Sequence, residues 1–305
     1  MRRKNKTLKQ IILYSVVVLT VLNSCKKNDS VEQIRDVAEQ SQEDDLSITD
    51  YLETHFYNYE DFQENPQDYS IEIVLDTISE ENSNKTPLIN QVLQKDVMIS
   101  TTDGDEVNHT LYYLVIREGI GKSPEVVDST YISYEGSLLN GSVFDERDFP
   151  IWLDLASVVR GFREGLPELK SGIFTVADDG ITTFKDYGQG VLFFPSGLGY
   201  YSQTSGGVPA YSPLIFKLSL FTVNDADHDQ DGILSYMEDV DNDGNPLNDN
   251  TDGDNLANMY DADDDGDGVP TIDEYDLNND GIPDDTNGNG TPDYLDNTTS
   301  NQSRE

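Results

Sequence analysis

The residues with the most distinctive chemistry are aspartates that recur at fixed spacing in the last third of the chain. One stretch reproduces the pattern DxDxDGxxxxxE with Asp227, Asp229, Asp231, Gly232, Ile233, Ser235 and Glu238. In such a loop the aspartates and the closing glutamate offer side-chain oxygens, the glycine permits a sharp turn, and the seventh position offers a backbone carbonyl. The pattern therefore predicts a site for calcium, a cation that prefers oxygen ligands.

The same loop recurs along this region. A second complete copy consists of Asp263, Asp265, Asp267, Gly268, Val269, Thr271 and Glu274. Four weaker copies, with Asn or Asp in place of the closing Glu, begin at Asp239, Asn250, Asp276 and Asp285. Their candidate ligands are Asp239, Asp241, Asp243, Asp252, Asp254, Asp261, Asp276, Asn278, Asp280 and Asp284. We expect these incomplete sites to bind more weakly or to share ligands.

The loops start at intervals of 9 to 13 residues, which leaves no room for a helix on each side of every loop, as an EF-hand requires. The series resembles thrombospondin type 3 repeats, in which the chain wraps around a line of calcium ions. That resemblance implies structural calcium and a largely irregular fold. The alternative is a disordered acidic spacer, the usual state of an acidic segment without periodicity.

The charge balance restricts the possible partners and metals. The chain carries 59 acidic and 19 basic side chains, a net charge of -40, which excludes the basic face that a nucleic acid requires. Between Asp225 and Asp296 there are 24 acidic residues and no Lys or Arg. One cysteine and three histidines leave no cluster with zinc-ligand spacing.

The first residues have the pattern of an export signal. Basic residues precede an apolar run from Ile11 to Leu22, which is too short to span a bilayer comfortably. The sequence Leu22, Asn23, Ser24, Cys25 resembles the lipobox of bacterial lipoproteins, which implies a lipid anchor on Cys25 and, because Lys26 follows, attachment to the outer membrane. The alternative is an ordinary cleaved signal with an incidental free cysteine.

Between this signal and the acidic region, the apolar pattern defines the elements. Residues 25–46 are polar and predict a tether. Ile48 to Phe56 has helical spacing and Tyr69 to Leu75 alternates like a strand, so 47–108 is interpreted as a small extension. Strand patterns at 111–116, 131–134, 191–194 and 214–223, around one helix near 159–169, predict an α+β domain, an antiparallel sheet wrapped on one helix.

This middle domain resembles the FKBP family of peptidyl-prolyl cis-trans isomerases over about 110 residues. The motifs, in family order, are Tyr134-Glu135-Gly136, Gly141-Ser142-Val143-Phe144-Asp145, Val158-Val159-Arg160-Gly161-Phe162, Pro195-Ser196-Gly197-Leu198-Gly199-Tyr200, Val208-Pro209 and Leu214 to Leu218. The resemblance implies Asp145, Tyr200, Phe144 and Phe162 as catalytic residues. It implies a substrate pocket lined by Tyr134, Phe149, Val158, Val159, Val208 and Phe216.

The resemblance also implies a mechanism without a cofactor. An aromatic bowl holds the proline ring of an X-Pro segment of an exported client, while Tyr200, the Val159 N–H and Asp145 contact the chain around the rotating bond. Phe162 stands where many members carry Trp, a change that should reshape the floor of the bowl. Two further departures affect substrate preference: 171–189 looks like an insertion between two strands, and 202–207 shortens and alters the loop at the pocket rim. A serine hydrolase is disfavoured because His55, His109 and His228 lie outside the best-patterned part of the domain.

The domains expected are a signal peptide (1–24), an acidic tether (25–46), an extension (47–108), an FKBP-like isomerase domain (109–223), calcium-binding repeats (224–297) and a polar tail (298–305). Together they predict a lipoprotein of the cell envelope that assists the folding of exported proteins. Two alternatives stay open: a non-catalytic FKBP-like binding or chaperone module, and a calcium-dependent adhesion or scaffold protein.

Overall fold

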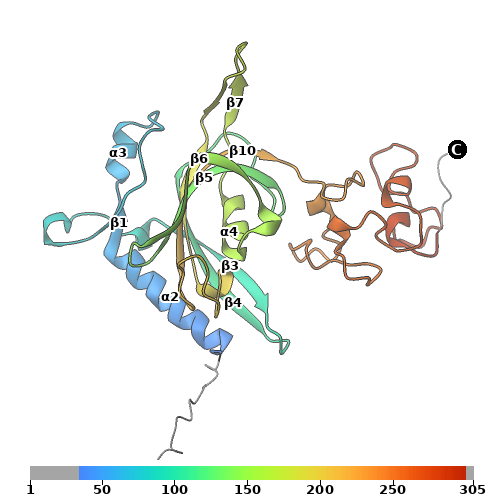
Figure 1. The fold of residues 1–305 in the computed structure, drawn as a ribbon, viewed down its shortest axis with the longest axis horizontal. Helices are drawn as coiled ribbons and strands as arrows, with labels where there is room; N and C mark the ends of the chain where they lie inside the picture. The colour runs from blue at the N-terminus through green and yellow to red at the C-terminus, as the bar shows by residue number, and fades with distance from the viewer. Residues whose placement is uncertain (1–33, 300–305) are drawn as a thin grey trace, which may run out of the picture. The chain divides into compact units, whose positions relative to one another are not determined.

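An antiparallel sheet organises the middle of the chain. The computed structural model describes residues 34–299, so the predicted signal peptide, Cys25 and the last six residues lie outside it. Across the six-stranded sheet the order is β3 (Leu93–Ser100), β4 (Glu106–Arg117), β9 (Gly188–Phe194), β10 (Leu214–Asn224), β5 (Ser129–Leu138) and β6 (Val143–Asp154). The sheet curves around the short helix α4 (Arg160–Gly165), as Figure 1 shows. This is the α+β arrangement predicted for the middle domain.

Both faces of the sheet are covered. On β9 every residue is buried: Leu192 and Phe194 belong to the core shared with α4, whereas Val191 and Phe193 belong to a second core on the opposite face. Successive side chains of a strand point to opposite faces, so a strand buried on both sides is a continuous apolar run. The sheet therefore needs a covering layer besides α4.

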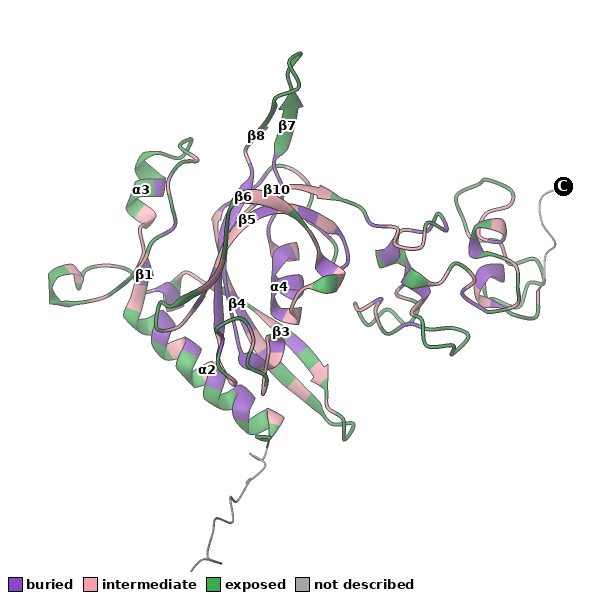
Figure 2. Ribbon diagram, in the orientation of Figure 1, coloured by how far each residue is buried: buried purple, intermediate pink, exposed green. Residues whose placement is uncertain are grey.

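The segment before the sheet supplies that layer. Helix α2 (Val37–Thr54) places Ile48, Tyr51 and Leu52 in the second core, and its buried positions recur along one side in Figure 2. The predicted tether is therefore wrong from Val37 onward. Polarity was misleading because the first half of α2 buries polar residues that are hydrogen-bonded, for example the Ser41 hydroxyl donating to the Asn108 carbonyl at 2.9 Å.

Three predicted boundaries in the extension also change. Helix α2 ends at Thr54, and His55–Tyr57 forms β1, which pairs with β2 (Leu75–Thr77). Of the strand expected at 69–75, only Leu75 belongs to a strand, as the first residue of β2. The chain before β2 is held by the Arg117 guanidinium, which donates to the carbonyls of Asn65 and Asp68. The sheet starts at β3, so the domain boundary expected at 108–109 falls inside β4. A short helix, α3 (Tyr59–Glu64), precedes β2.

The insertion expected at 171–189 is a hairpin. Strands β7 (Ile173–Val176) and β8 (Thr182–Lys185) pair with each other in a separate two-stranded sheet. Figure 1 shows this hairpin extending away from the main sheet. All four residues of β7 are exposed, so the hairpin adds no core.

After β10, the described residues form loops and 3₁₀ turns, with a repeated hydrogen-bond pattern. The backbone N–H of Ser235 donates to the carbonyl nine residues earlier, and the same bond recurs at Asn258, Thr271, Asp284 and Asp293. The distances are 2.7 to 2.9 Å. The acidic region therefore has a repeated backbone conformation in addition to its repeated sequence.

Within residues 34–299, no helix has the length and apolar character needed to cross a membrane.

Candidate functional sites

An aromatic cluster lies between α4 and the sheet. Phe162, on α4, is 3% exposed, and its ring centroid lies 5.0 Å from that of Phe216 on β10 and 5.9 Å from that of Tyr134 on β5. Phe144, on β6, meets Phe216 edge to face at 5.6 Å. Edge-to-face pairs are a favoured geometry for aromatic rings. The cluster brings together the aromatic residues that the sequence predicted for an apolar bowl.

Two glycines allow the rings to approach the backbone. A Cβ atom at Gly136 would lie 2.8 Å from ring atoms of both Phe144 and Phe216, and one at Gly161 would lie 2.3 Å from the Phe194 ring. Both distances are shorter than any real Cβ contact, so a side chain at either position would displace the aromatic wall. These glycines therefore belong to the site.

Asp145 forms the polar rim of the bowl. The Tyr134 hydroxyl donates to Asp145 Oδ2 at 2.6 Å, and Arg147 donates to Oδ1 at 2.8 Å. Burial raises the pKa of Tyr134 to about 12, and the Asp145 carboxylate beside it acts in the same direction. Tyr134 is therefore a neutral donor at physiological pH, and it fixes the orientation of Asp145.

The structure brings most of the predicted pocket residues together. Among the predicted residues besides Tyr134, Phe144, Phe162 and Phe216, Val208 belongs to the same core, and Val158, Val159 and Tyr200 pack against it. Phe149 is the exception, because it is 85% exposed. Between Ile132 and Tyr134 the pairing on β6 moves from Ile151 to Arg147, so extra residues bulge out of the strand around Phe149. The predicted role of Phe149 in lining the bowl is wrong for this structure.

Sequence reasoning missed the support of the loop that carries Tyr200. The carboxylate of Asp44, on α2, is 2% exposed and accepts from the Ser196 N–H at 2.8 Å and from its hydroxyl at 2.5 Å. Ser196 in turn accepts, through its carbonyl, from the N–H groups of Gly199 and Tyr201. Asp44 therefore anchors the turn around Tyr200. No spacing signal in the sequence links residues so far apart.

His109 lies beneath the same turn. Its ring is 1% exposed, and a Cβ atom at Gly197 would lie 2.2 Å from it, so the turn rests directly on the ring. Burial, and to a smaller extent the charge of Arg160, lowers the pKa of His109 to about 4. His109 is therefore a neutral packing residue.

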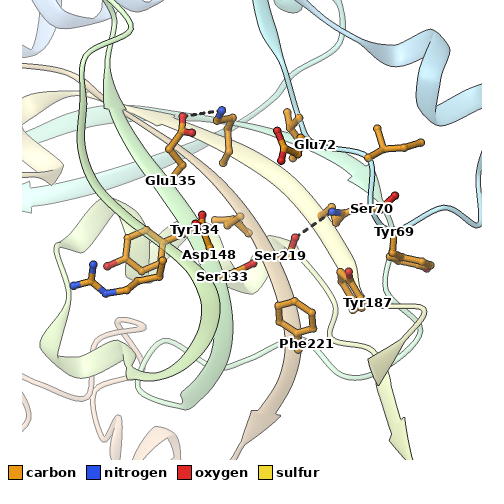
Figure 3. A pocket seen from close by; sticks show the side chains of 16 residues that line it. Tyr69, Ser70, Glu72, Ser133, Tyr134, Glu135, Asp148, Tyr187, Ser219 and Phe221 are labelled. Carbon is orange, nitrogen blue, oxygen red and sulfur yellow. Dashed lines mark hydrogen bonds and ion pairs between the residues drawn. The ribbon is translucent and has the colours of Figure 1, made fainter. Parts of the chain in front are cut away.

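A separate cavity lies beside the sheet. It has a volume of about 440 Å³. Residues 69–73, Tyr187 and side chains of strands β5, β6, β9 and β10 line it (Figure 3). Its lining is polar: Lys217 pairs with Glu135 at 2.7 Å, and Gln189 donates to Ser219 at 3.1 Å. Tyr134 is the one predicted pocket residue that also lines this cavity. The cavity is therefore not the aromatic bowl.

In the acidic region, carboxylates gather in five groups within the described residues. In each group, one oxygen from every member lies within 4.8 Å of the others. The groups are Asp227, Asp229 and Asp231; Asp231, Glu238 and Asp264; Asp239, Asp241 and Asp249; Asp252, Asp254 and Asp261; and Asp263, Asp265 and Asp267. Each group contains at least two of the predicted aspartates or glutamates.

The chemistry of these groups fits a hard cation. Both carboxylate oxygens of Glu238 and of Asp264 are buried without a hydrogen-bond partner among residues 34–299. Burial, and secondarily the neighbouring carboxylates, raises the pKa of Glu238 to about 10, that of Asp264 to about 8 and that of Asp231 to about 7. Buried carboxylates of this kind require a proton or a cation, and an all-oxygen donor set suits calcium.

Several predicted ligands have other roles in the structure. The hydroxyls of Ser235 and Thr271 accept from the backbone N–H groups of His228 and Asp264, and Asp284 accepts from the N–H of Leu277. These side chains therefore also hold the loop backbone. Their role as ligands stays a prediction.

The predicted carboxylates Asp243, Glu274, Asp276, Asp280 and Asp284 lie outside the five groups, and Asn278, Ile233 and Val269 have no carboxylate. Asp243 and Asp276 instead accept backbone N–H groups of their own loops. Conversely, Asp249 and Asp264 belong to carboxylate groups, although the spacing did not predict these two residues as ligands. They sit at positions of the loop pattern that carry no expected ligand.

Comparisons with known proteins support the FKBP-type assignment of the central domain. Residues 121–221 match the family model for FKBP-type peptidyl-prolyl cis-trans isomerase, and residues 228–281 match the model for BamM C-terminal. The peptidyl-prolyl cis-trans isomerase Mip of Coxiella burnetii is 33% identical over 37% of this chain and 44% of its own length. The FKBP-type isomerase FkpA of Escherichia coli K12 is 30% identical over 38% of each chain.

The chain thus spans less than half the length of each of these curated relatives. The crystal structure of FkpA from Escherichia coli overlaps 73% of this chain and 74% of that one, with 18% identity and a TM-score of 0.33. The family model, in contrast, begins before the Tyr134 motif and ends within β10, and so contains the whole aromatic bowl. Residues 121–221 are therefore a domain of the FKBP-type peptidyl-prolyl cis-trans isomerase family.

Proposed function

We propose that this protein accelerates cis-trans isomerisation of X-Pro bonds in exported client proteins. The observation that carries the proposal is the aromatic bowl of Tyr134, Phe144, Phe162 and Phe216 with Asp145 at its rim. Uncatalysed rotation about such a bond crosses a barrier of about 18 to 20 kcal/mol. A catalyst of this reaction needs no nucleophile and no cofactor.

The bowl acts mainly by desolvation. An amide is planar and charge-separated in its ground state, and removal of water destabilises that state relative to the twisted transition state. The proline ring enters the apolar bowl over Phe162. Val159 directly precedes α4, where backbone N–H groups lack intrahelical acceptors, so its N–H is placed to bind the substrate chain. Tyr200 donates to a substrate carbonyl, and Asp145 lies beside the rotating bond.

The test is an isomerase assay with short X-Pro peptides. Replacing Asp145 by Ala removes the rim carboxylate, and we expect kcat/KM to fall by about tenfold, the effect of losing about 1.4 kcal/mol of transition-state stabilisation. Glu146→Gln, an exposed position on the same strand, is the matched control and keeps full activity. A folded wild-type protein with no activity above the uncatalysed rate would favour the rival function, a non-catalytic binding or chaperone module.

We also propose that the acidic region binds structural calcium. The five carboxylate groups and the buried, unpartnered oxygens of Glu238 and Asp264 support this proposal. Calcium binds the folded loops better than the unfolded chain and so should stabilise the folded form. Titrate the full chain with calcium and follow bound ions and hydrodynamic radius: we expect uptake with compaction. No uptake at millimolar calcium would refute the proposal, and so would uptake without compaction.

The location of the protein is a further part of the proposal. The basic and apolar sequence before Cys25 supports export and lipid attachment at Cys25, and thus a place at the outer membrane. Cys25→Ser should move the protein from the membrane fraction to the soluble fraction. Unchanged partitioning would contradict lipid anchoring. An adhesion or scaffold role would instead appear as calcium-dependent binding to cells or to other envelope proteins, with no effect on client folding.

A further inference from the structure

The sequence predicts one metal site per acidic loop, but one of the carboxylate groups contains residues of two loops. Asp231 and Glu238 belong to the first loop, and Asp264 belongs to the fourth. One oxygen of each lies within 4.8 Å of the others, and the three residues are 2%, 0% and 1% exposed. The group is the only one of the five, among residues 34–299, in which all three members are buried.

Most oxygens of the group lack a polar partner, although Asp231 Oδ1 accepts the Ile233 N–H at 2.7 Å. Both oxygens of Glu238, both of Asp264 and Oδ2 of Asp231 have no hydrogen-bond partner among the described residues. Taking three carboxylates out of water with a single donor and no countercharge is strongly unfavourable, and native proteins rarely leave buried polar groups unpaired. Such a group is stabilised by protons or by a cation, and for a cation, oxygen ligands alone favour calcium over zinc.

Asp264 links the two loops through its backbone and its side chain. Its N–H donates to the Thr271 hydroxyl of its own loop at 3.1 Å, whereas one of its carboxylate oxygens lies within 4.8 Å of oxygens of Asp231 and Glu238 in the first loop. Packing between the two loops is visible independently: a Cβ atom at Gly232 would lie 3.8 Å from Ile272, in ordinary contact distance. The first and fourth loops therefore lie against each other beside the carboxylate group.

Asp264 is also unusual in the sequence. It follows directly after the first aspartate of its loop, a position occupied in the other five loops by His228, Val240, Thr251, Leu277 and Thr286. The loop pattern gives this position no ligand role. Only the fourth of the six loops has an acidic side chain at this position. This agrees with Asp264 binding an ion together with residues of another loop.

We propose that Asp231, Glu238 and Asp264 together bind one calcium ion that links the first acidic loop to the fourth. The proposal rests on the proposed calcium binding of the acidic region and deepens it. An ion shared in this way closes residues 239–262 into a loop. As with other cross-links, closure lowers the entropy of the unfolded chain, so this one ion should protect the whole enclosed segment.

The test compares two full-length variants that each remove one negative charge from the fourth loop. Asp264→Asn removes the proposed ligand. Asp273→Asn, at a half-buried position outside all five groups, is the matched control. Calcium stoichiometry is measured by equilibrium dialysis, and the enclosed segment is probed by limited proteolysis with mapped cleavage sites. Isomerase activity on a short peptide reports whether the rest of each variant is folded.

We expect Asp264→Asn to bind one calcium ion fewer, or to bind it at least tenfold more weakly, and to be cut within 239–262 at calcium concentrations where wild type and Asp273→Asn resist. The double variant Glu238→Gln/Asp264→Asn should lose no further ion, because both residues hold the same one. Equal behaviour of Asp264→Asn and Asp273→Asn would overturn the shared site while leaving calcium binding intact. A wild-type protein that takes up no calcium would instead overturn the underlying proposal.

Discussion

At the scale of single residues, Phe162 connects the stability of the domain with its proposed site. It is nearly fully buried, and its ring contacts those of Tyr134 and Phe216. Phe162→Ala should lower the free energy of unfolding by about 3 to 5 kcal/mol, the range for emptying an aromatic core position. Chemical denaturation measures this loss. Val176→Ala, at a position 62% exposed, should have little effect, and a similar loss in both variants would contradict the argument.

His109 provides a residue-scale prediction about pH. Its pKa is lowered from 6.5 to about 4 in the folded protein, mainly by burial. As the pH falls from 6.5 to 4, the unfolded chain binds a proton that the folded chain does not, so the free energy of unfolding decreases, by about 3 kcal/mol over the window. Above pH 6.5 this contribution is fully present.

The measurement is urea unfolding of wild type and His109→Gln at several pH values between 4 and 7. The comparison concerns the slope of the pH profile and not the absolute stability. The free energy of unfolding of the variant should decrease less steeply toward pH 4, since the other acidic groups titrate equally in both proteins. Parallel pH profiles would show that His109 carries a proton in the folded state or is exposed.

At the scale of elements, helix α2 is joined to the proposed active site through Asp44. Asp44→Ala leaves the buried Ser196 N–H and hydroxyl without their acceptor, which should cost about 1 to 3 kcal/mol. Because Ser196 organises the turn before Tyr200, kcat should fall more than KM rises if that turn orients a donor in the transition state.

Asp50→Asn is the control for this prediction, because Asp50 lies on the exposed side of the same helix. Denaturation and isomerase kinetics are measured on both variants. If Asp44→Ala is destabilised but retains full kcat, α2 supports the fold alone and does not position the Tyr200 turn.

At the scale of the whole molecule, the bowl and the carboxylate groups share no residue. We therefore expect calcium removal by a chelator to change the acidic region and leave catalysis intact. The hydrodynamic radius and the protease sensitivity of 225–299 should rise, because mutual repulsion of the carboxylates is no longer offset. The kcat/KM for a short X-Pro peptide should stay within about twofold, a difference of about 0.4 kcal/mol.

Adding back calcium should restore the compact form, whereas magnesium should restore it poorly, because it keeps its water and requires a tighter octahedron. A large loss of peptide isomerase activity on chelation would show that the two parts are coupled. Equal rescue by magnesium would indicate general charge screening instead of specific sites.

The sequence by itself determined the elements whose signals are local. Strand alternation, the motifs from Tyr134 to Tyr200 and the DxDxDG spacing depend on neighbouring residues, and they predicted the sheet on one helix, most of the bowl and most members of the carboxylate groups. In the structure, Phe144, Phe162 and Phe216 meet as those motifs implied. Calcium binding and lipid attachment stay predictions.

The tertiary structure decided what depends on contacts between distant residues. Helix α2 covers a face of the sheet with polar residues that are satisfied by partners such as Ser196, so its polarity resembled that of a tether. A bulge in β6 turned Phe149 out of the bowl, and packing between loops brought Asp264 to Glu238. In each case the deciding partner belongs to another element or loop, and residue type and spacing do not identify it.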